Sequence, residues 1–205
     1  MTKEKSKYIH KTAILGESAR FLQGCAPWDN KESEEPTTPD SCYIGAYSII
    51  GKNVKLGQEV IVDAYCKIGS NSVIGNRTLL TYRANVGPKT VIGEDCVIGG
   101  LIPERSSIGD RCRIFGQIVH SHYDPTMSWD HHETPEISPK INSDSFIGFH
   151  SVISGEIEIG PKSYICANST ISKTVPPYHI AYGLNKIIHY SKWKGKLKNS
   201  PFFNS

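Results

Sequence analysis

The chain has 205 residues, of which 38% are hydrophobic and 21% are charged, and its 23 basic and 20 acidic side chains give a net charge of +3. This length corresponds to one ordinary domain, and the composition excludes an intrinsically disordered chain because it allows a core to be buried. The charged start MTKEKSKYIHK leads into only a short apolar stretch, so we expect neither a signal peptide nor a membrane span, and a cytoplasmic protein.

The net charge is unevenly distributed along the sequence. Residues 183–205 contain five lysines and no acidic residue, so this segment carries +5 and the remainder of the chain −2. We therefore do not expect a nucleic-acid footprint over the whole chain. The segment is either a solvated basic surface or a contact for the phosphates of a ligand. Its lysines are Lys186, Lys192, Lys194, Lys196 and Lys198.

A period of six residues organises the chain. From Ile44 to Ile98 an aliphatic residue occurs at every sixth position, ten times in succession, and glycine follows eight of the ten. The residue two places before each is small, and it points to the same side as the aliphatic residue because six is a multiple of the strand period. We expect the glycine to supply unusual dihedral angles at a corner. Three strands and corners make a coil of about 18 residues, which predicts a parallel β-solenoid.

The same spacing continues in both directions with interruptions. It slips by four residues around 100–104, and its next step after Ile114 then falls on His120. After a long excursion the step of six resumes from Ile147 to Ile171. The total is 21 hexapeptides, or about seven coils. The other positions outside the central run are Ile9, Leu15, Phe21, Ile108, Ile153, Ile159 and Ile165.

We expect a single domain over residues 1–205, with the prism formed by residues 8–175. Two inserted segments, 22–41 and 121–143, contain several prolines and should be surface loops, where function concentrates in rigid scaffolds. The basic extension, residues 185–205, is expected to contain a short helix. The fold class is therefore all-β, with two loops and little helix.

Most of the six cysteines have a structural explanation. Four of them occupy the small inward position of the repeat, which predicts packing thiols and not a disulfide framework. Cys25 and Cys166 lie outside that position. The four predicted packing thiols are Cys42, Cys66, Cys96 and Cys112.

The repeat [LIV]-G-x-x-x-x resembles that of the hexapeptide-repeat acyltransferases, over about residues 8–190. The stretch FIGFHSVISGEIEIGPKSYICANSTISKTVPPYHIAYG is similar to the ending of that family. The resemblance implies a left-handed parallel β-helix and a homotrimer that binds acyl-coenzyme A along the groove between two neighbouring prisms. The sequence departs from the family at residues 183–186, where Gly-Leu-Asn-Lys replaces the common Gly-Asn-Pro-Ala.

Several residues are carried over from the family as lining the path of the coenzyme. Backbone N–H groups at turns and a lysine ammonium group suit phosphates. Gly148 and Ala167 have a simpler alternative role as corner residues of the repeat. The residues that the resemblance implies for cofactor binding are Gly148, Phe149, Ala167, Asn168, Lys173 and Pro176.

Acyl transfer needs a base near the nucleophile and donors for the tetrahedral oxyanion. His120 and His122 end the coil before the second loop, and HSHYDP resembles the His-x-His exit at which family members place their catalytic histidine. We take His122 as the first candidate for the base and His120 as the second. A buried core histidine is the alternative for His120, since the strict spacing points it inward. The backbone N–H of Gly148 is the expected oxyanion donor.

Three further residues are candidates for substrate binding. Trp129 and Asp130 lie on the second loop, where the indole could stack on an acyl chain or an adenine, and His150 is placed to face the groove. His131 and His132, on the same loop, are expected to be solvated.

These features predict an acyl-coenzyme A-dependent acyltransferase that acts on the amino group of a nucleotide-linked amino sugar. The enzymes of the dTDP-4-amino-4,6-dideoxyglucose (anthrose-type) branch are one candidate subgroup. The alternatives are an O-acetyltransferase acting on a polysaccharide or antibiotic hydroxyl, a γ-class carbonic anhydrase-like zinc lyase, and a non-catalytic scaffold. A zinc lyase needs three converging histidines, commonly including a His-x4-His pair that this sequence lacks, so we expect no metal.

Overall fold

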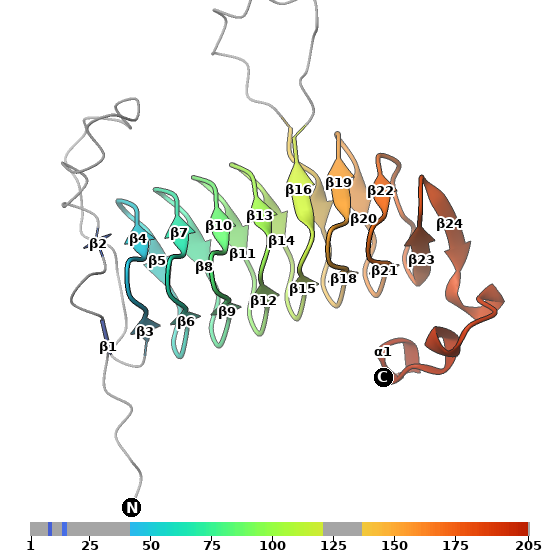
Figure 1. Ribbon diagram of the computed structural model, residues 1–205, viewed down its shortest axis with the longest axis horizontal. Coiled ribbons are helices and arrows are strands. Elements are labelled where there is room, and N and C mark those ends of the chain that lie inside the picture. The colour runs from blue at the N-terminus through green and yellow to red at the C-terminus, as the bar shows by residue number, and fades with distance from the viewer. Residues whose placement is uncertain (1–7, 10–13, 16–41, 121–136, 205) are drawn as a thin grey trace, which may run out of the picture.

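The structure is a computed structural model that describes residues 8–9, 14–15, 42–120 and 137–204 (Figure 1). Short strands, most of them two residues long, follow one another in a winding chain, and each coil adds one strand to each of three sheets. Strands of consecutive coils pair in parallel and in register, as in the pairing of Ile98 with Ile114. The predicted all-β parallel solenoid of about seven turns is confirmed.

The three sheets, which we call A, B and C, follow in that order around each coil. Sheet A contains β1 (Tyr8–Ile9), β3 (Tyr43–Ile44), β6 (Ile61–Val62), β9 (Leu79–Leu80), β12 (Val97–Ile98), β15 (Arg113–Ile114), β18 (Phe146–Ile147), β21 (Tyr164–Ile165), β23 (His179–Tyr182) and β24 (Lys186–His189). Sheet B contains β2 (Ile14–Leu15), β4 (Ile49–Ile50), β7 (Lys67–Ile68), β10 (Asn85–Val86), β13 (Leu101–Ile102), β16 (Gln117–Val119), β19 (Val152–Ser154) and β22 (Thr170–Ile171). Sheet C contains β5 (Lys55–Leu56), β8 (Val73–Ile74), β11 (Val91–Ile92), β14 (Ser107–Ile108), β17 (Lys140–Ile141) and β20 (Glu158–Ile159).

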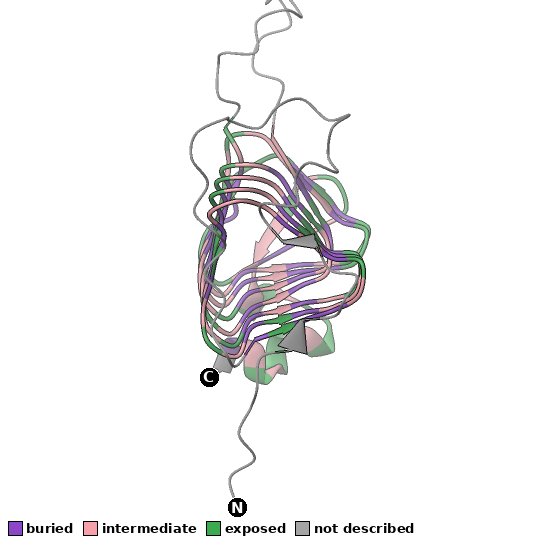
Figure 2. Cartoon of the chain, turned by 90° about the vertical axis from the view of Figure 1, so that its left-hand side faces the viewer, coloured by how far each residue is buried: buried purple, intermediate pink, exposed green. Residues whose placement is uncertain are grey.

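The interior contains the residues that the period of six predicts. Viewed along the solenoid, the coils superpose, and buried residues occur at corresponding places in successive coils (Figure 2). The small inward residues are often hydroxyl-bearing. Several of their hydroxyls donate to carbonyls one coil further on, and others, such as that of Ser151, donate within their own turn. Ser48 Oγ donates to the Asp63 carbonyl at 2.8 Å, and Thr78 Oγ1 donates to the Gly93 carbonyl at 2.9 Å. Serine and threonine are tolerated inside because these bonds satisfy their polar atoms.

Four of the cysteines are packing thiols, as predicted. Cys42, Cys66, Cys96 and Cys112 are all buried, and none of these four forms a disulfide. Burial raises the pKa of the Cys66 thiol to about 11. Contact with Cys96, together with burial, raises the pKa of Cys112. Thiols whose pKa is raised are poor nucleophiles, so we assign Cys66 and Cys112 no chemistry.

The glycines at the corners have a different role from the one that the sequence predicted. Gly75 does not have a positive φ, and the left-handed residue of its turn is Arg77, with φ 55°. A Cβ at Gly75 would lie 2.5 Å from the carbonyl carbon of Gly93 and 2.7 Å from the Glu94 nitrogen. The glycine is therefore required because consecutive coils approach closely at this point, and not because of unusual dihedral angles.

This close approach predicts the effect of adding one methyl group. Gly75→Ala should destabilise the fold by about 1–3 kcal/mol, because the backbone of the next coil must move. Thr81→Ala, at an equivalent turn position that already holds a Cβ, should cost well under half of that. Urea unfolding of both variants measures the difference, and equal midpoints for the two would contradict the explanation.

The spacing breaks twice at the turns between sheet A and sheet B. Only two residues separate Ile98 from Leu101, and only two separate Ile114 from Gln117. The inward position after Ile114 is consequently Ile118, which is fully buried, whereas His120 is half-buried. The prediction that His120 points into the core is wrong. The turn after Ile114 is shorter than the turns of the regular repeat, so the inward position moves to Ile118.

The second inserted segment ends earlier than the sequence predicted. Lys140 and Ile141, within the expected loop 121–143, form β17, and Ile141 is buried in the core. Ser138 Oγ donates to the carbonyl of Glu104 at 2.7 Å, so the chain is attached to the preceding coil before β17 begins. The first inserted segment, 22–41, and the repeat position Phe21 lie outside the described residues.

The basic extension begins with a strand where a helix was expected. β24 pairs antiparallel with β23, after a turn in which Gly183 and Asn185 have positive φ. Short helices follow further on: η2 (Tyr190–Lys192), η3 (Lys196–Asn199) and α1 (Pro201–Asn204). Phe203 is buried and stacks on Tyr190 at 4.7 Å between ring centroids. The ring of Phe202 contacts that of Tyr164 in β21 edge to face at 5.7 Å, which holds the extension against the last coils.

Candidate functional site

The candidate site lies at the corner between sheets B and C, which we call the BC corner. β16 is one residue longer than most strands, and His120 follows it directly. Val119 pairs with Ser154 of β19, and the Gly155 N–H donates to the Val119 carbonyl at 3.4 Å. Gly155 has φ +98°, a conformation that side chains disfavour, so the turn beside His120 is specific to glycine.

His120 and Lys173 share this corner. The turn after β22, which contains Lys173, lies two coils beyond the turn that begins at His120. With strands spaced by about 4.8 Å, the two backbones are about 10 Å apart along the solenoid. Lys173 is exposed and His120 is half-buried. An imidazole that can accept a proton and an ammonium group that can attract a phosphate therefore lie on one edge of the prism.

Four other predicted cofactor residues come together at a different corner, between sheets A and B (the AB corner). The turn containing Gly148 and Phe149 stacks on the turn containing Ala167 and Asn168, and the Asn168 N–H donates to the Phe149 carbonyl at 2.9 Å. Phe149 is 56% exposed, and its ring stacks on that of Phe115 at 4.5 Å. This aromatic pair is open to solvent on the same corner.

The backbone of Gly148 cannot act as the predicted oxyanion donor. Its N–H already donates to the carbonyl of Ile165 at 2.9 Å, as part of the ladder between consecutive coils. A Cβ at Gly148 would lie 2.6 Å from the Ala167 nitrogen, so this glycine meets the same packing need as Gly75. The prediction is wrong because the N–H of this corner glycine already donates to a carbonyl of the neighbouring coil and is not available to an oxyanion.

Pro176 and His150 are also separated from His120 within one chain. The Pro176 carbonyl accepts a hydrogen bond from Ser163 Oγ at 2.9 Å, at the corner between sheets C and A (the CA corner). His150 is an exposed, left-handed residue of the AB corner, next to Phe149. The predicted site residues that the structure describes are thus distributed over three corners, and among them Lys173 alone lies with His120.

The remaining predictions fall outside the described residues. These are the first-choice base His122 and the substrate-binding candidates Trp129 and Asp130, together with His131 and His132. Within the residues that the structure does describe, no three histidine, cysteine or acidic side chains are grouped so that they could hold a metal ion.

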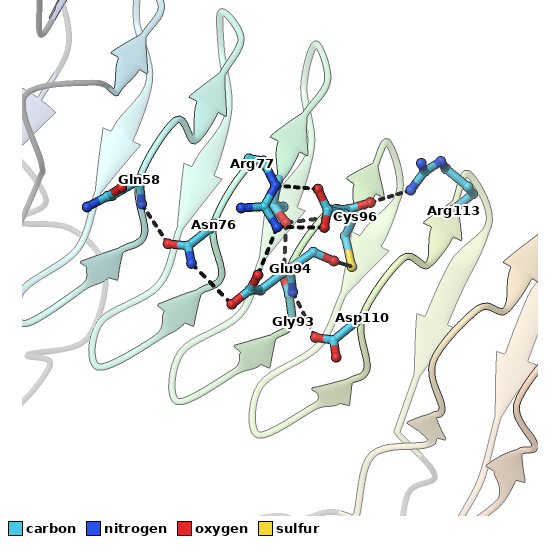
Figure 3. A network of polar contacts seen from close by, with 10 residues as sticks. Gln58, Asn76, Arg77, Gly93, Glu94, Cys96, Asp110 and Arg113 are labelled. Carbon is cyan, nitrogen blue, oxygen red and sulfur yellow. Dashed lines mark hydrogen bonds and ion pairs between the residues drawn. The ribbon is translucent and has the colours of Figure 1, made fainter.

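A column of charged residues at the CA corner was missed by the sequence analysis. At the CA corner of six consecutive coils, the residue with positive φ carries a charged side chain, and the sign of the charge alternates from one coil to the next. Arg77 forms a bidentate contact with Asp95 at 2.7 and 2.8 Å and also reaches Glu94 at 2.9 Å (Figure 3). Reading the sequence one coil at a time, instead of six residues at a time, would have found it. The column is Glu59, Arg77, Asp95, Arg111, Asp144 and Lys162.

The column makes a specific prediction about acid stability. The hydrogen-bonded Arg111 guanidinium, 2.6 and 2.8 Å from the carboxylate, lowers the pKa of Asp144. A lowered folded-state pKa contributes stability above the unfolded value of about 4, and this contribution is lost as the pH falls through the folded value. Asp144→Asn removes this contribution and should lower the melting temperature near neutral pH. The decrease should be only a few degrees, because the Arg111 side chain is 55% exposed and water screens the ion pair. The gap between wild type and variant should close towards pH 3, and a gap independent of pH contradicts the argument.

The sequence of the repeats matches a known family. Residues 41–76 match the family model described as bacterial transferase hexapeptide, six repeats. This part of the solenoid is therefore built from repeats similar to those of the bacterial transferase hexapeptide family. The chain matches no curated protein.

Solved structures that match this chain include several acyltransferases. One is a perosamine N-acetyltransferase from Caulobacter crescentus in complex with CoA and GDP-perosamine, with 16% identity and a TM-score of 0.38 over 89% of this chain and 57% of that chain. Another is the UDP-N-acetylglucosamine acyltransferase of Campylobacter jejuni, with 18% identity and a TM-score of 0.48 over 90% and 72%. A third is an acetyltransferase structure from Bacillus cereus, with 21% identity and a TM-score of 0.37 over 87% and 83%. The chain thus spans little more than half of the first of these proteins.

Proposed function

We propose that the protein is an acyl-coenzyme A-dependent acyltransferase and that its acceptor is the amino group of a nucleotide-linked amino sugar. The match of its repeats to the bacterial transferase hexapeptide family carries the proposal. The position of His120 supports it, since this histidine leaves the core register and stands at a solvent-facing corner with Lys173. A prism that serves only as a scaffold would need the repeats, but it would not need a histidine and a lysine at one solvent-facing corner.

In the reaction we propose, the imidazole of His122 or His120 accepts a proton from the acceptor nitrogen as that nitrogen attacks the thioester carbonyl. A new C–N bond forms, the tetrahedral intermediate collapses, and the C–S bond breaks. The sulfur leaves as coenzyme A thiolate, which takes up a proton. Lys173 attracts a phosphate of the coenzyme, and its charge holds the cosubstrate without taking part in bond formation.

In a homotrimer, predicted site residues that lie at different corners of one chain could come together at the contact between two chains. In this arrangement the AB corner of one copy, with Phe149 and Asn168, would face the BC corner of the next, with His120 and Lys173. The outer side of sheet A supports self-association, because Tyr43 and Ile61 are 40% and 46% exposed there. Sedimentation of the full chain tests this part of the proposal, and a monomer at micromolar concentration would overturn it.

Thiol release from acetyl-coenzyme A tests the activity directly. The full chain is mixed with acetyl-coenzyme A and, in separate reactions, with a UDP-linked amino sugar, a dTDP-linked amino sugar, or an acceptor that has hydroxyl groups only. Release that depends on an amino acceptor supports the proposal, whereas release with the hydroxyl acceptor alone identifies an O-acyltransferase. Release with none of them, together with one zinc ion per chain in the purified protein, favours the zinc lyase.

The nucleotide is found by ligand-dependent stability. A ligand that binds only the native state raises the melting temperature by mass action. Coenzyme A, a uridine diphosphate and a thymidine diphosphate are added separately to the full chain. A rise with coenzyme A and with one nucleotide supports the proposal, and a rise with coenzyme A alone argues against a nucleotide-linked acceptor.

A further inference from the structure

The last two coils and the extension have a charge unlike that of the rest of the molecule. Residues 159–205 contain seven lysines, no arginine and no acidic residue, so the +3 chain has a C-terminal end of +7 and a remainder of −4. In the described part of the extension every lysine side chain is exposed. These lysines are Lys186, Lys192, Lys194, Lys196 and Lys198.

An exposed leucine is held rigidly at the same end. Leu184 is the tip of the turn between β23 and β24 and is 71% exposed, more than any other large hydrophobic side chain among the described residues. Asn185 fixes the turn, because its Oδ1 accepts from the Ser172 N–H at 2.8 Å and its Nδ2 donates to Ser172 Oγ at 2.9 Å. The Gly183 N–H donates to Ser169 Oγ at 3.1 Å. The apolar side chain is therefore presented by an ordered turn.

Aromatic rings connect this turn to the lysines. The ring of Trp193 contacts that of Tyr182 edge to face, with centroids 5.1 Å apart, and the ammonium group of Lys186 lies 5.8 Å from the Tyr182 centroid. Lys192 and Lys194 are the immediate neighbours of Trp193 in the sequence. In Figure 1 the strand β24 and the helices after it form the far end of the solenoid. We call this end the terminal basic surface, defined by the five lysines of the extension with Leu184 and Trp193.

We propose that the terminal basic surface docks on an anionic lipid bilayer. Clusters of four to eight lysines attract anionic headgroups, and lysine stems and indole rings sit well at the boundary between water and lipid. The exposed leucine adds the second, apolar contribution that stable peripheral binding needs. None of the helices in the described residues is long and apolar enough to cross a membrane, so the contact we propose is peripheral.

The composition favours lipid over nucleic acid as the partner. Recognition of nucleic-acid phosphates relies strongly on arginine, whose planar fork pairs with two phosphate oxygens, and residues 159–205 contain none. Lysines act as point charges that need no fixed geometry, which suits a fluid layer of headgroups. The turn of Leu184 lies against the BC corner, because Asn185 is hydrogen-bonded to Ser172, the neighbour of Lys173. The five lysines of the extension follow that turn in the sequence, so docking rests on them and not on the proposed catalytic residues.

Co-sedimentation of the full chain with vesicles tests the proposal. Vesicles of phosphatidylglycerol and phosphatidylcholine in equal parts are compared with vesicles of phosphatidylcholine alone, at low and high salt. We expect binding to the anionic vesicles only, with loss at high salt. The quadruple variant Lys192→Gln, Lys194→Gln, Lys196→Gln and Lys198→Gln should lose on the order of 100-fold in partitioning, and Leu184→Ser should lose several-fold.

A variant with the same change in net charge is the control. Lys52→Gln, Lys55→Gln, Lys67→Gln and Lys89→Gln remove four positive charges from the N-terminal coils and should leave vesicle binding within about two-fold of wild type. Equal losses in both quadruple variants, or no binding by wild type, overturn the proposal. Retention of the wild type on a DNA duplex but not on anionic vesicles assigns the surface to nucleic acid and also overturns it. Release of the protein from vesicles by added coenzyme A would assign the lysines to the cosubstrate and would also overturn the proposal. Failure of the acyltransferase assay does not affect this test, because vesicle binding is measured without any acyl transfer.

Discussion

Replacement of His120 by asparagine is expected to lower the rate of acyl transfer by about 10²–10⁴-fold, the contribution of a positioned general base. Asparagine keeps a polar side chain of similar size at the end of β16, and His120 is only half-buried, so the fold should be retained. The measurement is thiol release from acetyl-coenzyme A with the preferred amino acceptor. The loss should be in kcat, because the base acts on the transition state and not on binding.

His122→Asn is the companion variant, since the sequence makes His122 the first candidate. If His122 is the base, its variant shows the large loss and His120→Asn a smaller one. His189→Asn, in the hairpin at the far end of the prism, should keep the wild-type rate and serves as the control. If His120→Asn and His122→Asn both keep the wild-type rate and the wild-type pH profile, neither histidine is the general base. A small loss in rate with a flattened pH profile is also consistent with a histidine base, because an amine is already a good nucleophile.

Ile147→Ala is expected to destabilise the protein by about 2–5 kcal/mol. Ile147 is fully buried in β18, and its register partners in the neighbouring coils, Ile114 and Ile165, are fully buried as well. A stack of identical side chains cannot close around the missing atoms without shifting the coils on both sides, so a cavity should remain. Urea unfolding, followed by circular dichroism, measures the change.

An exposed position in the same kind of strand is the control for this variant. Val91 is the outward residue of β11 and is 50% exposed, so Val91→Ala should change the free energy of unfolding by less than about 0.5 kcal/mol. A similar cost for the two variants would mean that the interior of the prism is not the main source of stability. A loss at Ile147 confined to part of the unfolding curve would show that the coils unfold in separate units.

Much of the fold could be predicted from the sequence because a solenoid repeats one local rule. Inward residues such as Ile44 and Ser48 obey the period of six, and the structure buries them. The prediction failed where the rule changes locally, as in the short turn at Phe115 that moves Ile118 into the core. Periodicity also cannot give the hand of the coil, which here comes only from the family resemblance. The strand at residues 186–189 was missed because its partner, β23, is not part of the repeat.

The candidate site was less predictable than the fold. Corner residues far apart in the sequence meet only when the number of residues in every turn is known, so Gly148 and His120 could not be assigned to different corners in advance. The role of Gly148 as an oxyanion donor failed because its N–H is used by the neighbouring coil. The Phe115–Phe149 stack depends on a shortened turn, which no period of six contains.

The reversed strand β24 has a consequence for how the protein behaves at high concentration. A solenoid of parallel, in-register strands offers at each end a template on which another chain could continue the stack. At the C-terminal end the direction of the last strand in sheet A is opposite to that of all the others, and it begins with a lysine. A second molecule cannot extend the parallel register there. The hairpin therefore acts as a stop against fibre growth.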